Sequence, residues 1–91
     1  MNSNKINWIK AKILHKLHRH GYWGGRHTSF DNLPKGFEKS LRGEVKGAAE
    51  ELIDEGLLKG KTTSYGIEVS LNAEKKGEIE RMITKFIEDE D

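Results

Sequence analysis

The segment from Leu41 to Leu71, LRGEVKGAAEELIDEGLLKGKTTSYGIEVSL, constrains the fold of this chain more than any other stretch. Its first part places apolar residues at helical spacing and stops at Gly56, a residue type that commonly ends a helix in a left-handed conformation. Its last part alternates apolar and polar residues from Ile67 onward, the period-two pattern of a half-buried strand. The segment therefore predicts a helix followed at once by a two-stranded hairpin with a polar, basic tip.

The remaining sequence predicts three more helices and one short strand. The predicted helices cover residues 4–20, 28–33, 39–55 and about 73–88. The predicted strands cover residues 57–62 and 67–71, with a turn at 63–66 and a short strand within 21–28. We therefore expect a mostly α fold with a small β-hairpin, which belongs to the α+β class, and an acidic tail at 88–91.

Length and composition narrow the possibilities further. A chain of 91 residues predicts a single small domain, here 1–91. Without cysteine, disulfides and thiolate metal sites are excluded. The first ten residues lack the apolar stretch of a signal peptide, and no apolar run approaches membrane-spanning length. These features predict a soluble, cytoplasmic protein without a membrane partner.

Charge is distributed unevenly along the chain. Residues 1–46 contain ten Lys and Arg against three acids, a net charge of +7, whereas residues 47–91 contain six against twelve, a net charge of −6. Such a charge dipole suits a protein with one anion-binding face. The alternative is a solvated surface on which charges cluster by chance.

The segment TSFDNLPKGFEKSLRGEVKGAAEELIDEGLLKGKTTSYGIEVSLN carries a family resemblance, and EELIDEGLLKGKTTSYGIEVSLN carries most of it. It resembles the winged-helix variant of the helix-turn-helix superfamily over about residues 5–71, and small prokaryotic and archaeal proteins have similar stretches. The resemblance implies a recognition helix at about 39–55 and a wing at about 59–66. Winged helices mostly bind duplex DNA, although some bind RNA and some bind only proteins.

We therefore expect a double-stranded DNA-binding protein, such as a small transcription regulator. The alternative is a winged-helix module that binds protein or RNA and does not bind duplex DNA. The candidate DNA contacts are Lys39, Ser40, Arg42, Gly43 and Lys46 in the helix, Lys59, Lys61, Thr62, Thr63, Ser64 and Tyr65 in the wing, and, as weaker candidates, Lys35 and Arg26. Changing Lys39, Lys46 and Lys61 together to Ala is expected to abolish duplex binding.

Two of these assignments have a simpler explanation. The wing lysines can serve only to discourage edge-to-edge strand pairing. Gly43 and Gly47, one turn apart on the exposed side of the helix, either allow close approach of a phosphate or are merely tolerated there.

Aromatic residues outside this segment suggest contacts of another kind. Trp8 falls off the apolar stripe of the first helix, and the last helix has an apolar stripe of its own. We expect Trp8 and Ala11 to meet Ile83, Phe86 or Ile87, within one chain or across a homodimer interface. Tyr22 and Trp23, flanked by glycines, either close the core or stack on a base or partner.

No pattern indicates catalysis or a bound cofactor. The histidines His15, His18, His20 and His27 lack the convergent spacing of a zinc site and are expected at the surface. A glycine-rich phosphate loop and a serine elbow motif are both missing. We therefore expect no enzyme activity, no metal, no cofactor and no small-molecule substrate.

Overall fold

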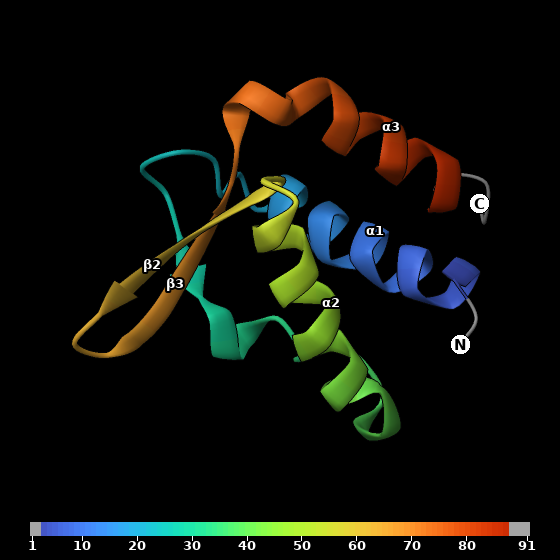
Figure 1. Ribbon diagram of the computed structural model, residues 1–91, viewed down its shortest axis with the longest axis horizontal. Coiled ribbons are helices and arrows are strands. Elements are labelled where there is room, and N and C mark those ends of the chain that lie inside the picture. Colours follow the sequence, from blue (N-terminus) through green and yellow to red (C-terminus); the bar gives the residue numbers. More distant parts are fainter. Residues whose placement is uncertain (1–2, 88–91) are drawn as a thin grey trace.

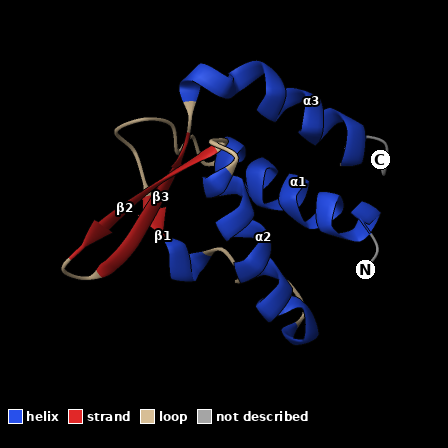
Figure 2. Ribbon diagram, viewed as in Figure 1, coloured by secondary structure: helices blue, strands red, loops and turns tan. Residues whose placement is uncertain are grey.

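The computed structural model describes residues 3–87, which form three α-helices and a small antiparallel sheet. In chain order, the elements are α1 (Ser3–Arg19), β1 (Thr28–Ser29), the 3₁₀ turns η1 (Phe30–Asn32) and η2 (Lys39–Leu41), α2 (Arg42–Asp54), β2 (Leu58–Thr63), β3 (Gly66–Leu71), the 3₁₀ turn η3 (Ala73–Lys75) and α3 (Lys76–Phe86). Figure 2 shows the separation of the helices from the sheet. The predicted α+β class is confirmed.

The helices are layered with α1 in the middle. In Figure 1, α3 lies above α1 and α2 lies below it, and α1 packs against both. Their facing sides supply most of the core together with the base of the sheet. The fully buried aliphatic side chains of these elements include Ile9, Ile13, Leu14, Leu17, Val45, Leu52, Val69, Leu71 and Ile79. Each such residue stabilises the fold by about 1.5–3 kcal/mol relative to exposure.

The sheet has the strand order β1-β3-β2, so the hairpin strand β3 is central. The hairpin is in register from Leu58 opposite Leu71 to Thr63 opposite Gly66. The short strand β1 adds Thr28 opposite Val69, and Trp23 forms an isolated parallel bridge to Leu71. The loop after α1 is therefore fastened to the base of the hairpin.

The second predicted helix is wrong, because residues 28–29 form β1 and residues 30–32 form the three-residue turn η1. Ser29 caps this turn, with its hydroxyl accepting a hydrogen bond from the Asp31 amide. Pro34 has no amide proton for a helical hydrogen bond, and Gly36 has a φ of +94°. The Nζ of Lys16 binds the carbonyls of Asn32 and Lys35, which satisfies groups that a continued helix would have paired.

Other boundaries shift by small amounts. Residues 39–41 of the third predicted helix form the turn η2, and residues 73–75 of the last one form η3, so each α-helix starts later than predicted. Gly56 has the expected positive φ, +81°. Both hairpin strands extend one residue further toward the turn. The short strand expected within 21–28 contains only Thr28 and continues to Ser29, because Gly21 and Gly24 both have positive φ and form turns.

No helix in the described range 3–87 is both long and apolar enough to cross a lipid bilayer.

Candidate nucleic-acid interface

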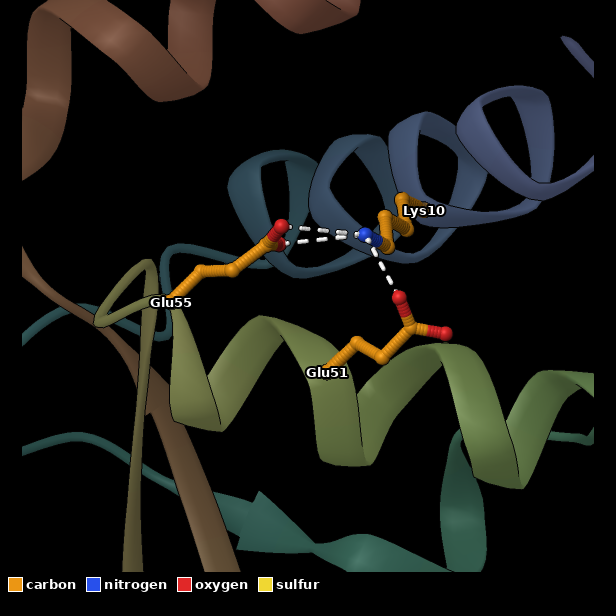
Figure 3. Close-up of polar contacts among 3 residues, drawn as sticks. All are labelled: Lys10, Glu51 and Glu55. Atoms are coloured by element: carbon orange, nitrogen blue, oxygen red, sulfur yellow. Dashed lines mark hydrogen bonds and ion pairs between the residues drawn. The ribbon is translucent and has the colours of Figure 1, made fainter. Parts of the chain in front are cut away.

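Helix α2 is fixed to α1 through its acidic residues. The Nζ of Lys10, whose side chain is only 6% exposed, lies 3.3 Å from a carboxylate oxygen of Glu51 and 3.1 Å from one of Glu55 (Figure 3). Lys5 makes a further, exposed pair with Glu44 at 3.2 Å. Two lysines of α1 are therefore paired with three acids, two within α2 and one at its C-cap.

The opposite side of α2 is basic at its start and acidic at its end. Lys39, Arg42 and Lys46 are exposed, and within residues 3–87 none of them forms an ion pair with a carboxylate. Glu50 and Asp54 are exposed further along the helix. The N-cap, Leu41, makes no side-chain cap, so the positive end of the helix dipole adds to these cations. The first turns of α2 therefore attract anions, and its last turns repel them.

The hairpin turns one face toward α2. Cross-strand partners share a face, so Gly60 lies on the same face as Val69, and Thr62 on the same face as Ile67. A Cβ atom at Gly60 would lie 3.2 Å from the Cδ1 of Ile53, which shows that α2 crosses β2 at this glycine. A larger residue at this position would push the helix and the strand apart.

Lys59 and Lys61 lie on the other face of the hairpin, away from α2. Lys61 is opposite Glu68 in the ladder, and the Oε2 of Glu68 lies 2.8 Å from the Nδ1 of His27. The outer face therefore mixes charges of both signs. The sequence predicts which residues form the hairpin, but the strand register separates its lysines from the basic start of α2.

At the hairpin tip, the polar groups have different accessibility. The Oγ1 of Thr63 donates to the Gly66 carbonyl at 2.8 Å and accepts from the Tyr65 amide at 3.1 Å, so this hydroxyl is committed to the turn. Thr62 and Ser64 are exposed, and Tyr65 is 96% exposed. Tyr65 is the most prominent group that the wing offers to a partner.

Figure 1 shows the hairpin tip and the start of α2 projecting from the side of the molecule opposite α3. The two projections diverge from the 55–57 junction rather than running alongside each other. The two weaker candidates lie elsewhere. Arg26 places its guanidinium 5.9 Å from the ring centre of Tyr22, and Lys35 belongs to a cluster beside α1.

The residues expected at an interface lie mostly within the core of one chain. Ala11 is fully buried, and Ile83 and Ile87 are nearly so, because α1 and α3 pack on each other. Trp8 is half-buried and meets Phe37 edge to face, with 6.4 Å between ring centres. Phe86 is half-buried against the same core. Trp8 therefore has an aromatic partner, Phe37, within the chain, and it lines the same pocket as Ile87.

The aromatic loop and the histidines have local partners. Tyr22 and Trp23 are half-buried and pack against the core, and Trp23 meets His18 edge to face. His18 also lies 3.4 Å from Glu80, which links α1 to α3. Among residues 3–87, no three His, Cys, Asp or Glu side chains gather closely enough to hold a metal ion.

Two features of the structure were missed in the sequence. The burial of Lys10 between two helices has no local signal, because its partners lie about 45 residues away. The cluster of Lys12, Lys16 and Arg19 does have a local signal in the sequence, because positions separated by four and three residues share a helix face.

Comparison with protein-family models, curated proteins and solved structures gave no match. Function must therefore be argued from this geometry.

Proposed function

We propose that this chain is a winged-helix protein that binds duplex DNA, with the start of α2 in the major groove and the hairpin tip against the backbone. The order α1, β1, α2, β2, β3 and the sheet order β1-β3-β2 support the winged-helix assignment. Only the second helix of the expected arrangement is reduced, to the turn η1.

The observation that carries the proposal is the unneutralised basic start of α2, on the side of the molecule away from α3. Lys39, Arg42 and Lys46 supply charge for phosphates, and Arg42 or Ser40 can reach base edges. Gly43 leaves room for the backbone of the helix to approach the DNA. The acidic end of α2 restricts close contact to its first turns.

The wing contributes through its tip more than through its lysines. Ser64 and Tyr65 are exposed there and can donate hydrogen bonds to phosphates. Lys59 and Lys61 face away from α2, so DNA held by α2 meets them only where it curves around the hairpin. We therefore assign the larger share of the affinity to the helix.

The test compares two triple variants that remove equal charge. Lys39→Ala/Arg42→Ala/Lys46→Ala changes the proposed interface, and Lys76→Ala/Arg81→Ala/Lys85→Ala removes three exposed cations from α3. Fluorescence anisotropy with a short random duplex, repeated over a range of salt concentrations, measures the affinity. The slope of log K against log salt is expected to become about 2–3 units shallower in the helix variant, at about 0.9 per lost phosphate contact.

The control variant is expected to keep most of the affinity and the full slope. Equal losses in both variants would show that binding depends on total charge and not on α2. A Lys59→Ala/Lys61→Ala variant is expected to have a smaller effect than the helix variant. If the wild-type chain fails to bind duplex even at low salt, the proposal is wrong.

The alternative, a module that binds protein, has one observation in its favour. Tyr65 is 96% exposed and Ile67 is 44% exposed, and they are the large hydrophobic residues that the described surface leaves most open. Such residues suit a protein contact. Tyr65→Ser is expected to leave duplex affinity within about threefold if Tyr65 serves a protein partner, because no phosphate contact is then lost.

A further inference from the structure

A pocket of about 580 Å³ lies on the flank of α1 that faces the loop before α2. This volume falls in the range of small-molecule sites, about 300–1,000 Å³. Its walls are α1, residues 35–38 with Leu41, and Ile87 after the end of α3. It does not include the exposed side of α2 or the hairpin, so it is separate from the proposed DNA interface.

Four cations line this pocket. Lys12, Lys16 and Arg19 come from one face of α1, and Lys35 comes from the loop opposite. Glu38 is the one acid among the described residues that line the pocket. Within residues 3–87, Lys12, Arg19 and Lys35 form no ion pair with a carboxylate. The pocket is therefore strongly positive and lacks neutralising partners in the described chain.

Lys16 fixes the floor of this cluster. Its Nζ donates to the carbonyls of Asn32 at 2.8 Å and Lys35 at 2.9 Å, which holds the loop against α1. Burial, and then the charges of Lys35 and Arg19, lower the pKa of Lys16 below its ordinary value. The neighbouring cations thus repel one another, and a bound anion would relieve this repulsion.

The rest of the pocket is apolar and aromatic. Trp8 and Phe37 meet at 90° with 6.4 Å between ring centres, and Leu41 and Ile87 lie beside them. The Nζ of Lys12 lies 5.4 Å from the Trp8 ring centre, so a cation already borders the aromatic surface. A matching ligand has a flat apolar ring joined to a strongly anionic group.

We propose that this pocket binds a small phosphorylated molecule that carries an aromatic ring, of the class of a mononucleotide. Lys12, Arg19 and Lys35 hold the phosphate, because guanidinium and ammonium groups donate charge-assisted hydrogen bonds to its oxygens. The ring lies against Trp8 and Phe37. Lys16 keeps its structural role and supplies its remaining N–H group. This inference does not depend on DNA binding.

The acidic residues 88–91 bear on the test, although they lie outside the described range. They follow Ile87, which lines the pocket, and their sequence is Glu-Asp-Glu-Asp. Their carboxylates can compete with a phosphate for the same cations. Binding is therefore measured on the full chain and on a chain that ends at residue 87.

Isothermal titration with ADP, adenosine and inorganic phosphate separates the two halves of the proposed ligand. ADP is expected to bind at least about tenfold more tightly than adenosine or phosphate alone, a difference of about 1.4 kcal/mol. In the NMR spectrum, ADP is expected to shift the Trp8 indole and Phe37 ring signals. If ADP binds no better than phosphate, or binds neither the full chain nor the shortened chain, the proposal is wrong. ADP binding by the shortened chain alone supports the site and indicates that the tail competes for it.

Charge-removal variants locate the site. Lys12→Gln, Arg19→Gln and Lys35→Gln are each expected to weaken ADP binding about tenfold, since each removes one charge-assisted hydrogen bond. Lys76→Gln and Lys85→Gln, which remove exposed charges from α3, are expected to leave ADP affinity within about twofold because they contact no phosphate. Equal weakening in both groups would indicate non-specific attraction and overturn the proposal. Far-UV circular dichroism of each variant verifies that the fold is retained.

Discussion

At the scale of single residues, Lys10 is the most consequential side chain that carries a charge. Its stem is buried between α1 and α2, and its ammonium reaches Glu51 and Glu55 (Figure 3). Both carboxylates are about half exposed, at 56% and 49%, so water still solvates them. The contact thus fixes the position of α2 without requiring fully buried anions.

Lys10→Met is expected to destabilise the protein by about 1–2 kcal/mol, because it keeps the buried stem but leaves two carboxylates close together without a cation. This is below the cost of breaking a fully buried pair, since the carboxylates remain hydrated. Urea unfolding measures the change. Lys5→Met, at the exposed pair with Glu44, is the control and should cost under about 1 kcal/mol. Equal costs would refute the distinction.

Lys16 makes stability depend on pH at alkaline values. Because its pKa is lowered in the folded state, the unfolded chain, with a pKa near 10.5, holds more protons in the interval between the two values. Stability must therefore rise with pH across that interval. The free energy of unfolding of the wild type, minus that of Lys16→Met, is expected to increase as the pH approaches 10.5. A difference that stays constant or falls would contradict the assignment.

At the scale of elements, α2 is held by buried residues and by Lys10, but two glycines in its first half lower its helix propensity. Val45, Ala48, Ala49 and Leu52 are buried, and Lys10 holds the far end. By contrast, Gly43 and Gly47 are helical residues whose missing side chains would meet nothing within 4 Å. The glycines therefore serve no packing purpose inside the chain.

Gly47→Ala is expected to stabilise the protein by about 0.5–1 kcal/mol, the difference in helix propensity, because the added methyl has open space. Thermal unfolding measures this gain. If the glycine permits close approach of DNA, the same variant will bind duplex more weakly although it is more stable. Unchanged affinity would favour simple tolerance of glycine at this position. A loss of stability would show that the open space is not available.

The crossing of α2 over β2 shows why the sequence predicts elements better than their contacts. The apolar periods of 41–52 and 67–71 are local, so the helix and the hairpin could be predicted from them. The position of Gly60 beneath Ile53 depends on tertiary packing, and the faces of Lys59 and Lys61 depend on strand register. Neither has a local signal. Similarly, Pro34 indicates a break, but the role of Lys16 in ending the second helix requires the folded loop.

At the scale of the whole molecule, the three helices bury their apolar sides within one chain, because α1 packs against both α2 and α3. The apolar side of α3 contributes Ile79 and Ile83 to the core shared with α1. The pocket beside Lys12 escaped prediction because its walls come from three distant segments. Trp8 and Ala11, expected to pack within one chain or across a homodimer, already have partners within the chain.

Ile83→Ala is therefore expected to destabilise the protein by about 2–4 kcal/mol through the cavity that it leaves between α1 and α3. The melting temperature of both wild type and variant should not change with protein concentration, because the contact lies within one chain. Thermal unfolding over a wide concentration range tests this. A melting temperature that rises with concentration would instead indicate that these helices pack between subunits.

The base of the hairpin is tied down on both strands. The Leu57 amide binds the Leu52 carbonyl, and the Asn72 amide binds the Leu57 carbonyl, each at 3.0 Å. These hydrogen bonds fix the strand register at the base of the hairpin, and the residues near the turn extend its length. Inserting two residues into each strand would preserve which side chains face α2. The distance over which this molecule can touch a second surface is consequently adjustable by insertion, with no cost to the helices that hold it together.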